Sequence, residues 1–481
     1  MMNERLRGWA DLAHSSRPIL QSPAEGRLVS YSLPAPDIAT DTFLHLAEGQ
    51  ERFFWQNGLD RTVYAGFGMA AQLMAWGGGR FKEIKQKIES LFTNAVRLAD
   101  QPDLASPRFF GGFAFRDDFT PDNTWSVFHP AHFILPHYQM VKTGNQTWLT
   151  INALLAEDDD LADTRLQLHE ALQARLQLLA GANGLDSTGP PAPLSLKINY
   201  PMTFSQWQES INLAISQIKG SDLEKVVLSR VCELRSKERI DVCHALVYLN
   251  ENYKECTRFL FEPRPYHAFY GATPELLLQT KGIEVETMAL AGSMRRGRNS
   301  NEDQILQHHL LNSAKDRHEH ALVVDSICRR LEALDIDLDV TDQPNIYTLS
   351  YIHHLLTPIK GRLKKETGIL PLLETLHPTP ALGGSPRDLA LDFIRRAEPV
   401  PRGWYAAPVG WVDANMDGQF AVGIRSAVAQ ERRVWLYAGA GIVAESEPQK
   451  EWSETSLKFQ PMFAALGLDV DPQNSAIEES I

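Results

Sequence analysis

The chain has 481 residues, of which 43% are hydrophobic and 22% are charged, a composition that excludes an intrinsically disordered protein. Its formal net charge of -13 argues against non-specific binding to nucleic acid, and it contains no run of about 20 apolar residues that could span a membrane. Residues 1–16 include Glu4, Arg7 and Asp11 and lack the apolar stretch of a signal peptide. We therefore expect a cytoplasmic protein with neither a nucleic-acid nor a membrane partner.

The first 180 residues contain two segments typical of strands and two typical of helices. Residues 61–66 have the composition of a strand, and residues 109–115 set aromatic side chains around two glycines, as a strand with a bulge or a close backbone approach would. Apolar residues at helical spacing predict helices over residues 81–98 and 161–179. None of these segments carries a recognisable group of catalytic residues.

The clearest change of composition lies at residues 181–201, where residues 188–193 are rich in proline and glycine. Hydrophobic cores usually split beyond about 250–300 residues. The segment is therefore open to two interpretations, a connection between two domains or a loop inside one continuous domain.

Helices and strands mix in the second half of the chain. The patterns predict helices over residues 207–218 and 320–334 and strands over residues 225–231 and 434–443. A further pair of strands is expected where an Asp-Gly dipeptide, a strong hairpin signal, separates residues 408–413 from residues 419–425. Antiparallel hairpins interspersed with helices favour an α+β fold over a repeating βαβ fold.

The four cysteines, Cys232, Cys243, Cys256 and Cys328, include no CxxC pair. So few cysteines in so long a chain do not make a disulfide framework, and the paired spacing of a zinc ribbon is missing. We therefore expect reduced thiols.

The C-terminal helix carries the most informative charges. Glu451, Glu454 and Lys458 are spaced i, i+3 and i+7, which places all three on one helix face. Two carboxylates so close repel each other unless a cation joins them, and Mg²⁺ takes oxygen ligands of this kind. From spacing alone, a solvated face with a Glu454–Lys458 pair is the more common alternative.

A second acidic pair lies in residues 315–320, which open another helix. Asp316 and Glu319 share a helix face and could meet the acidic pair of the last helix in a hard-metal site. His318 and His320 are about 200° apart around a helix and cannot both bind one ion. The alternative is a group of acids favoured by the helix dipole.

Two single residues have the chemistry of a base and an acid. Lys225 begins an apolar strand; a lysine there usually points outward, but if buried it could act as a base. Glu275 lies beside a run of leucines that could raise its pKa and make it an acid, although a turn residue facing solvent has the same pattern.

Arg425 ends a strand, and Gly439 and Gly441 interrupt the next one. An arginine beside exposed backbone N–H groups is a plausible carboxylate clamp. The glycines do not extend into a nucleotide-binding GxGxxG pattern, and there is no GxSxG motif to support a hydrolase. The His-His pairs at 308–309 and 353–354 are typical of ordinary polar or core positions.

Together and in this order, these segments resemble the chorismate-utilising enzymes, specifically the isochorismate synthases. The resemblance rests on residues 223–230 (LEKVVLSR), 271–276 (GATPEL), 286–297 (ETMALAGSMRRG), 315–320 (KDRHEH), 376–386 (LHPTPALGGSP), 402–411 (RGWYAAPVGW), 424–426 (IRS), 438–443 (AGAGIV) and 451–455 (EWSET). Residues 108–115 (RFFGGFAF) are similar to the menaquinone-pathway branch more than to the siderophore branch. Departures are small: Thr273 replaces a frequent serine and Ala407 a frequent glycine.

The resemblance implies a Mg²⁺-dependent isomerase that converts chorismate to isochorismate. Lys225 would deprotonate the water that attacks C2, and Glu275 would protonate the departing C4 hydroxyl. Mg²⁺ would be held by Glu319 and Glu454, with Glu451 and Asp316 as partners. Substrate-binding positions would be Gly292, Ser293, His377, Leu382, Tyr405, Arg425, Gly439, Gly441 and Lys458.

The fold implied by the resemblance is α+β, with two packed, mostly antiparallel β-sheets and helices on the outside. Residues 1–195 would then be part of the same intertwined fold as the catalytic region, residues 196–465, followed by a tail at 466–481. We expect a monomer. The alternative functions are a salicylate synthase, a siderophore-pathway isochorismate synthase, an aminating relative, whose anthranilate type lacks a lysine at position 225, and a non-catalytic binding protein on the same scaffold.

Overall fold

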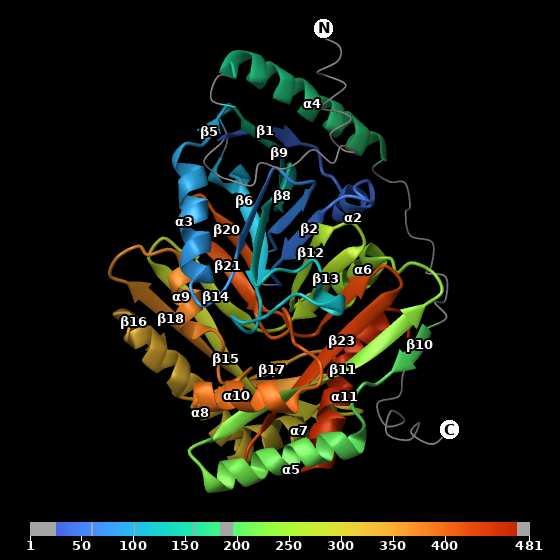
Figure 1. Ribbon diagram of the computed structural model, residues 1–481, viewed down its shortest axis with the longest axis vertical. Coiled ribbons are helices and arrows are strands. Elements are labelled where there is room, and N and C mark those ends of the chain that lie inside the picture. Colours follow the sequence, from blue (N-terminus) through green and yellow to red (C-terminus); the bar gives the residue numbers. More distant parts are fainter. Residues whose placement is uncertain (1–25, 59–60, 101, 157–158, 183–195, 469–481) are drawn as a thin grey trace.

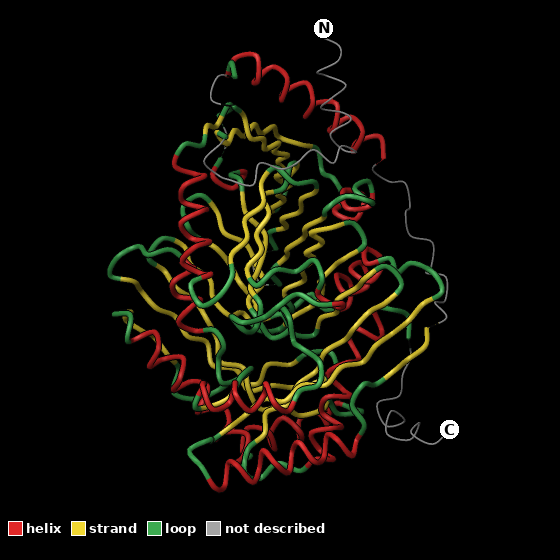
Figure 2. Tube along the Cα trace, viewed as in Figure 1, coloured by secondary structure: helices red, strands yellow, loops and turns green. Residues whose placement is uncertain are grey.

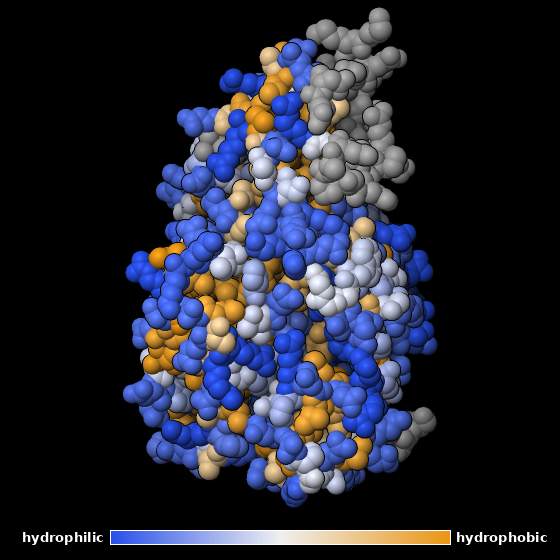
Figure 3. Space-filling model, turned by 60° about the vertical axis from the view of Figure 1, so that its left-hand side comes forward, coloured by the Kyte–Doolittle hydropathy of each residue, from blue (hydrophilic) through white to orange (hydrophobic). Residues whose placement is uncertain are grey.

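The computed structural model describes residues 26–58, 61–100, 102–156, 159–182 and 196–468. Within these residues the chain forms two large sheets with helices around them, which confirms the expected α+β class (Figures 1 and 2). None of the described helices is long and apolar enough to cross a membrane. The face in Figure 3 is largely hydrophilic, with hydrophobic residues in separate groups. The four cysteines are free thiols.

The first sheet has thirteen strands in the described part of the chain. In spatial order they are β10 (Leu196–Asn199), β11 (Lys225–Ser236), β23 (Arg433–Ile442), β22 (Ser426–Gln430), β13 (His267–Thr273), β12 (Thr257–Arg264), β2 (Arg52–Gln56), β3 (Val63–Phe67), β8 (Tyr138–Thr143), β9 (Gln146–Leu155), β1 (Arg27–Ala35) and β5 (Val96–Arg97), with β19 (Gly384–Ser385) paired to β11.

The second sheet has ten strands among the described residues. Their order is β16 (Ile336–Val340), β18 (Ile352–Leu363), β15 (Glu284–Arg295), β14 (Leu276–Lys281), β21 (Gly418–Val422), β20 (Pro408–Asp413), β6 (Arg108–Phe113), β7 (Ala131–Leu135) and β4 (Ala71–Ala75), with β17 (Asn345–Thr348) paired to β18. Both sheets mix strands from before and after residues 183–195, since β2 pairs with β12 and β6 pairs with β20. The Pro-Gly-rich residues 188–193 lie outside the described residues.

The helices lie mostly on the outside of the sheets (Figure 2). They are α2 (Thr40–His45), α3 (Arg80–Thr93), α4 (Leu161–Ala182), α5 (Phe204–Gly220), α6 (Val242–Asn252), α7 (Ser300–Asn312), α8 (Ala314–Glu332), α9 (Ile369–Leu376), α10 (Arg387–Ala397) and α11 (Pro448–Ala465), with short 3₁₀ turns at Asp103–Ala105 and Asn123–Trp125.

Two hydrophobic clusters hold these layers together. The larger one joins the inner faces of both sheets, with Phe261 and Phe269 from the first sheet and Phe110 and Phe420 from the second. The smaller one lies between the outer face of the first sheet and helices that include α4, α6 and α11. Burial of apolar surface on this scale is the main stabilising contribution to the fold.

The predicted elements are confirmed with shifted ends. Helix α8 begins at Ala314, so the segment 315–320, expected to open a helix, and the helix predicted over residues 320–334 belong to one element. Ser313 caps it by accepting a hydrogen bond from the Asp316 N–H. Helix α3 ends at Thr93 instead of residue 98, because Val96 and Arg97 pair with β1. The expected hairpin is β20–β21, with Gly418 already in the second strand.

Candidate active site

One cavity collects most of the residues that the sequence singled out. It is bounded by β11 and β23 of the first sheet, by β15 of the second, and by helices α8 and α11. Its lining includes Glu275, Gly292, Ser293, Asp316, Glu319, Leu382, Tyr405, Arg425, Gly439, Gly441, Glu451, Glu454 and Lys458. These residues come from segments up to 183 positions apart in the chain, counted from Glu275 to Lys458.

Helices α8 and α11 supply four carboxylates to this cavity and three lysines lie among them. The Nζ atom of Lys225 lies 2.8 Å from Glu319 Oε1, that of Lys315 lies 3.1 Å from Glu451 Oε1, and that of Lys458 lies 2.6 Å from Glu454 Oε1. The fourth carboxylate, Asp316, hydrogen-bonds the Ser313 hydroxyl at the start of α8.

The pKa values of these carboxyls shift in different directions. Burial raises the pKa of Glu451, and the neighbouring Glu454 raises it further, against the lowering effect of Lys315. Burial likewise raises the pKa of Asp316. For Glu319 burial also acts to raise the pKa, but Lys225, Lys315 and Lys458 together outweigh it and the pKa is lowered. The cluster therefore still favours an added positive charge at Glu451 and Asp316.

The donor set fits a hard cation. Carboxylate oxygens are the ligands that Mg²⁺ prefers, and Mg²⁺ needs only one or two of them directly when water and substrate complete its coordination. Among the described residues, no three His, Cys, Asp or Glu side chains already surround a common point as a complete protein cage would. Each of Glu319, Glu451 and Glu454 is held by an ion pair with one lysine.

Lys225 is fully buried, so the outward-pointing alternative for this residue is wrong. Its strand, β11, lies between β19 on one side and β23 on the other, which leaves this end of the strand no open edge. Gly441 of β23 provides the space for the lysine. A Cβ atom at Gly441 would lie 2.9 Å from Lys225 Cε and 2.5 Å from Glu319 Oε1, so a larger residue would push the two apart.

Glu275 lies at the junction of β13 and β14 and is 5% exposed. Burial raises the pKa of its carboxyl to about 8, although Lys225, Arg425 and Lys458 all act to lower it. The solvent-facing alternative for Glu275 is therefore wrong. A carboxyl that keeps its proton at neutral pH can act as an acid.

Arg425 lines the cavity beside a residue that sequence reasoning missed. His354, from the pair at 353–354, is buried and lies 3.3 Å from Arg425 Nη2 through its Nε2 atom. Its Nδ1 atom lies 3.1 Å from the Gly292 carbonyl oxygen and 3.0 Å from Ser293 Oγ. In a strand one of two adjacent histidines must face each side, and the sequence does not tell which one faces the cavity.

Tyr405 and Lys458 frame the Gly439 backbone. A Cβ atom at Gly439 would lie 3.1 Å from the Tyr405 hydroxyl oxygen, and the Lys458 ammonium donates a hydrogen bond to the Gly439 carbonyl at 2.8 Å. Arg402, a second residue that the sequence did not single out, ties the wall together. It donates hydrogen bonds to the Leu382 and Val227 carbonyls, both at 2.8 Å, and pairs with buried Glu398.

His377 is the expected binding residue that the structure does not bring to this cavity. Its ring is buried between Phe115 and Phe81, and its Nε2 atom lies 3.0 Å from the Phe115 carbonyl oxygen. It lines a separate depression with Arg80 and Arg387. Only the following loop, at Ala381 and Leu382, reaches the cavity.

This combination of a buried lysine, a protonated carboxyl, a carboxylate cluster and an arginine-histidine corner occurs on a fold with two packed sheets. The family model for chorismate binding enzymes matches residues 14–467 of the chain. The chain therefore belongs to the chorismate-binding enzymes.

Relatives that align over most of the chain are isochorismate synthases. The chain is 32% identical to isochorismate synthase MenF of Bacillus subtilis, over 92% of this chain and 93% of that protein. It is 35% identical to the salicylate biosynthesis isochorismate synthase of Pseudomonas aeruginosa, over 87% and 86% of the two chains. The solved structure of MenF, the menaquinone-specific isochorismate synthase from Escherichia coli, matches with a TM-score of 0.74 at 26% identity and covers 97% of this chain and 99% of that one.

Proposed function

We propose that the protein is an isochorismate synthase, which moves a hydroxyl group from C4 to C2 of the chorismate ring. The observation that carries the proposal is the placement of two groups at one cavity. Glu275 lines the cavity with a buried carboxyl whose pKa is about 8, and the fully buried Lys225 lies against the cavity wall, 2.8 Å from the lining residue Glu319. The relatives that align over most of the chain, which are named isochorismate synthases, support it.

In the proposed reaction one water molecule enters and another leaves. Lys225 takes a proton from the water that attacks C2. Glu275, protonated at neutral pH because of its burial, gives its proton to the departing C4 hydroxyl, while the ring double bonds shift. A positioned acid or base contributes roughly 10²–10⁴-fold to the rate of such a step.

The remaining residues would hold the two carboxylates of the substrate. Arg425, Tyr405 and Lys458 surround the Gly439–Gly441 backbone and would bind the enolpyruvyl carboxylate, where bidentate contact with a guanidinium is strong. Gly292 and Ser293 would bind the ring carboxylate. Leu382 would pack against the ring from the opposite wall.

The carboxylate cluster is the proposed Mg²⁺ site. Glu319 and Glu454 would hold the ion, with Glu451 and Asp316 contributing through water. When bound, the ion supplies positive charge that neutralises the ring carboxylate of a dianionic substrate. Burial raises the pKa of Glu451 and of Asp316, which supports this assignment, because a nearby cation would stabilise the ionised form of both carboxyls.

We further propose that the enzyme acts as a monomer in the cytoplasm and feeds menaquinone biosynthesis. The pathway assignment rests on the similarity of residues 108–115 to that branch and on the two MenF relatives, each of which aligns over more than nine-tenths of its length. In the structure residues 108–113 form β6, between β20 and β7 in the second sheet.

The experiment that tests the function is a product analysis. Purified protein is incubated with chorismate and Mg²⁺, and the products are separated by HPLC. We expect isochorismate as the enzymatic product. Salicylate with pyruvate, formed faster than spontaneous decay, would identify a salicylate synthase. Product formed with ammonia but not with water would identify an aminating enzyme and contradict the role given to Lys225.

Removal of the metal should stop the reaction without unfolding the protein. Treatment with EDTA should lower the rate at least about 100-fold, because the dianionic substrate loses its main counter-charge at the carboxylate cluster. Excess MgCl₂ should restore the rate. EDTA saturated with Mg²⁺ beforehand is the control. Full activity in EDTA would exclude the proposed metal role, and circular dichroism should show the same fold in both samples.

A further inference from the structure

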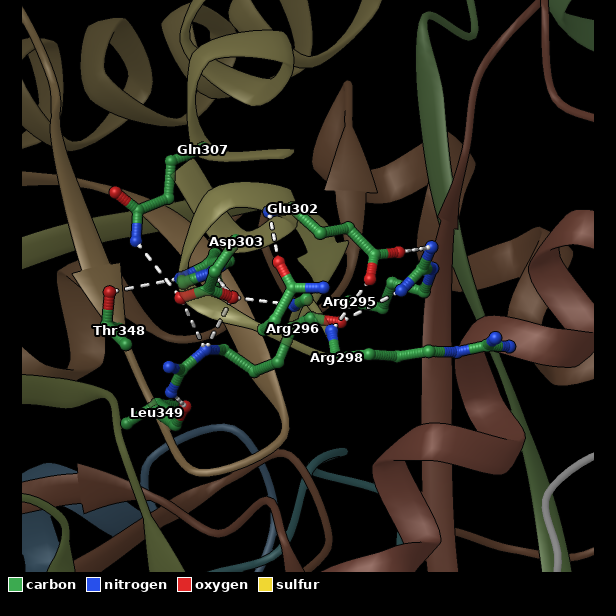
Figure 4. A network of polar contacts seen from close by, with 11 residues as sticks. Arg295, Arg296, Arg298, Glu302, Asp303, Gln307, Thr348 and Leu349 are labelled. Atoms are coloured by element: carbon green, nitrogen blue, oxygen red, sulfur yellow. Dashed lines mark hydrogen bonds and ion pairs between the residues drawn. The ribbon is translucent and has the colours of Figure 1, made fainter. Parts of the chain in front are cut away.

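Asp303, in the first turn of α7, is the centre of a polar network outside the cavity (Figure 4). Its carboxylate accepts hydrogen bonds from Arg296 Nε at 2.9 and 3.1 Å, from the Gly297 N–H at 2.6 Å and from Gln307 Nε2 at 3.5 Å. His353 Nε2 lies 2.9 Å from its Oδ1 atom. The side chain is 12% exposed, and the Arg296 and Gly297 hydrogen bonds hold the pKa of Asp303 well below its ordinary value.

The network joins the ends of two neighbouring strands. Arg296 and Gly297 follow the last residue of β15, and His353 is the second residue of β18. Arg296 also donates to the Leu349 carbonyl, just before β18, and Thr348 Oγ1 lies 3.0 Å from His353 Nδ1. One carboxylate therefore fixes both strand ends against α7 (Figure 4).

The register between the two strands shifts only a few residues away from this point. Residues Ala291 and Ser293 pair with consecutive residues of β18, so Gly292 is an extra residue in β15, with φ at 78°. A bulge of this kind turns the backbone and re-aims side chains. It places the Gly292 carbonyl and the Ser293 hydroxyl beside His354 at the cavity wall.

The partners of His354 determine its tautomer. The Gly292 carbonyl can only accept a hydrogen bond, so Nδ1 carries the proton, and Nε2 then accepts from the Arg425 guanidinium. Burial, followed by the charges of Arg425 and Lys458, lowers the pKa of His354 well below its ordinary value, which agrees with a neutral ring. With Nδ1–H as the donor, the Ser293 hydroxyl keeps its own hydrogen for a group in the cavity.

We propose that Asp303 is a positioning residue for the corner formed by Ser293, His354 and Arg425, in which Ser293 would bind the ring carboxylate and Arg425 the enolpyruvyl carboxylate. It acts through His353 and Arg296, which hold the ends of β18 and β15 so that the bulge at Gly292 keeps its donors aimed into the cavity. The proposal rests on the function proposed above and assigns Asp303 no contact with the substrate.

A double-mutant cycle between Asp303→Asn and Ser293→Ala tests this role. Asp303→Asn removes the charge and one acceptor at nearly constant shape. We expect it to raise KM for chorismate about 10-fold with a smaller effect on kcat, because it weakens binding of a carboxylate that is held throughout the reaction. In the double variant KM should rise at least about 3-fold less than the product of the two single effects, since both changes disable one corner.

The matched control is Glu302→Gln, the same loss of charge one residue earlier. Glu302 pairs with Arg295 and accepts from the Arg298 N–H, on the outer side of the network. The Glu302→Gln variant should leave KM near the wild-type value. In the double variant with Ser293→Ala, the KM increase should equal the product of the two single effects. If Asp303→Asn does not fold, His353→Phe keeps the ring shape, removes the same link and goes through the same cycle.

The outcomes separate the two proposals. If the wild-type protein does not convert chorismate, the proposed function fails. Suppose instead that the wild type converts chorismate, but Asp303→Asn only lowers Tm, or the KM increase in the double variant equals the product of the two single effects. Asp303 is then a structural residue alone, and the positioning role is overturned.

Discussion

Lys225→Ala should lower kcat for isochorismate formation by about 10²–10⁴-fold, because no other described amine occupies the buried end of β11 to take the proton from water. KM should change little, since Lys225 lies behind Gly441 and is not part of the cavity lining. The measurement is steady-state kinetics with saturating Mg²⁺ and HPLC quantification of isochorismate.

Two further variants separate chemistry from structure at this position. Lys225→Met keeps the apolar stem and removes the ammonium group, so it should lose as much activity as Lys225→Ala while packing better. Lys360→Ala is the control, because Lys360 also lies in a strand but its side chain is 67% exposed. Retained turnover in both Lys225 variants would remove this residue from the role of base.

Glu275→Gln should lower kcat at least about 100-fold and change the pH dependence. The proposed acid must carry its proton, so the wild-type rate should fall as pH rises through the pKa of about 8. The variant has no proton to lose there, and its residual rate should lack this decrease. A wild-type rate that stays level from pH 7 to pH 10 would contradict the assignment.

The same carboxyl should also be visible in the stability of the protein. Its folded-state pKa, about 8, lies above the ordinary value of 4.5, so its contribution to stability is fully present below pH 4.5 and is lost as pH rises toward 8. The loss is at most about 5 kcal/mol. Glu275→Gln should therefore have the higher Tm at pH 8–9 and lose this advantage near pH 4.5. Glu286→Gln, at a half-exposed side chain, should show no such pH-dependent difference.

The parts of the fold that sequence could predict were those determined by neighbours in the chain. The β20–β21 hairpin follows from its Asp-Gly dipeptide, and the shared face of Glu451 and Glu454 follows from helical spacing. The burial of Lys225 could not be predicted in this way. It depends on β19 and β23, which lie about 160 and 215 residues further along the chain.

The same limit applies to His354 and Arg402. Each has its role because of backbone carbonyls and side chains brought from distant segments, such as Gly292 for His354 and Val227 for Arg402. Alternation along a strand shows that adjacent histidines face opposite sides, but only tertiary packing decides which side is the cavity. For His377 the resemblance supplied a binding role, whereas the structure turns its ring toward Phe115.

The three lysine–glutamate pairs neutralise most of the negative charge of the carboxylate cluster within the protein itself. Each glutamate proposed as a metal ligand already has a counter-ion, in Lys225, Lys315 or Lys458. A divalent cation must compete with these ammonium groups, and Lys315 and Lys458, once displaced, are free to attract an anion. An ammonium group cannot take a proton, so Lys225 serves as the base only after the cation has displaced it from Glu319 and its own proton has left. Mg²⁺ and chorismate should therefore bind cooperatively, each raising the affinity for the other by the same factor.

Calorimetric titration of the Glu275→Gln variant, which keeps all three lysine–glutamate pairs and should turn over at least about 100-fold more slowly, should accordingly show tighter Mg²⁺ binding in the presence of chorismate than in its absence. Equal affinities would show that the lysines do not act as exchangeable counter-ions. Cooperative binding of this kind would let the lysines neutralise the glutamates while the cavity is empty. The glutamates would then be released for Mg²⁺, and the lysines for the substrate, only when both ligands bind.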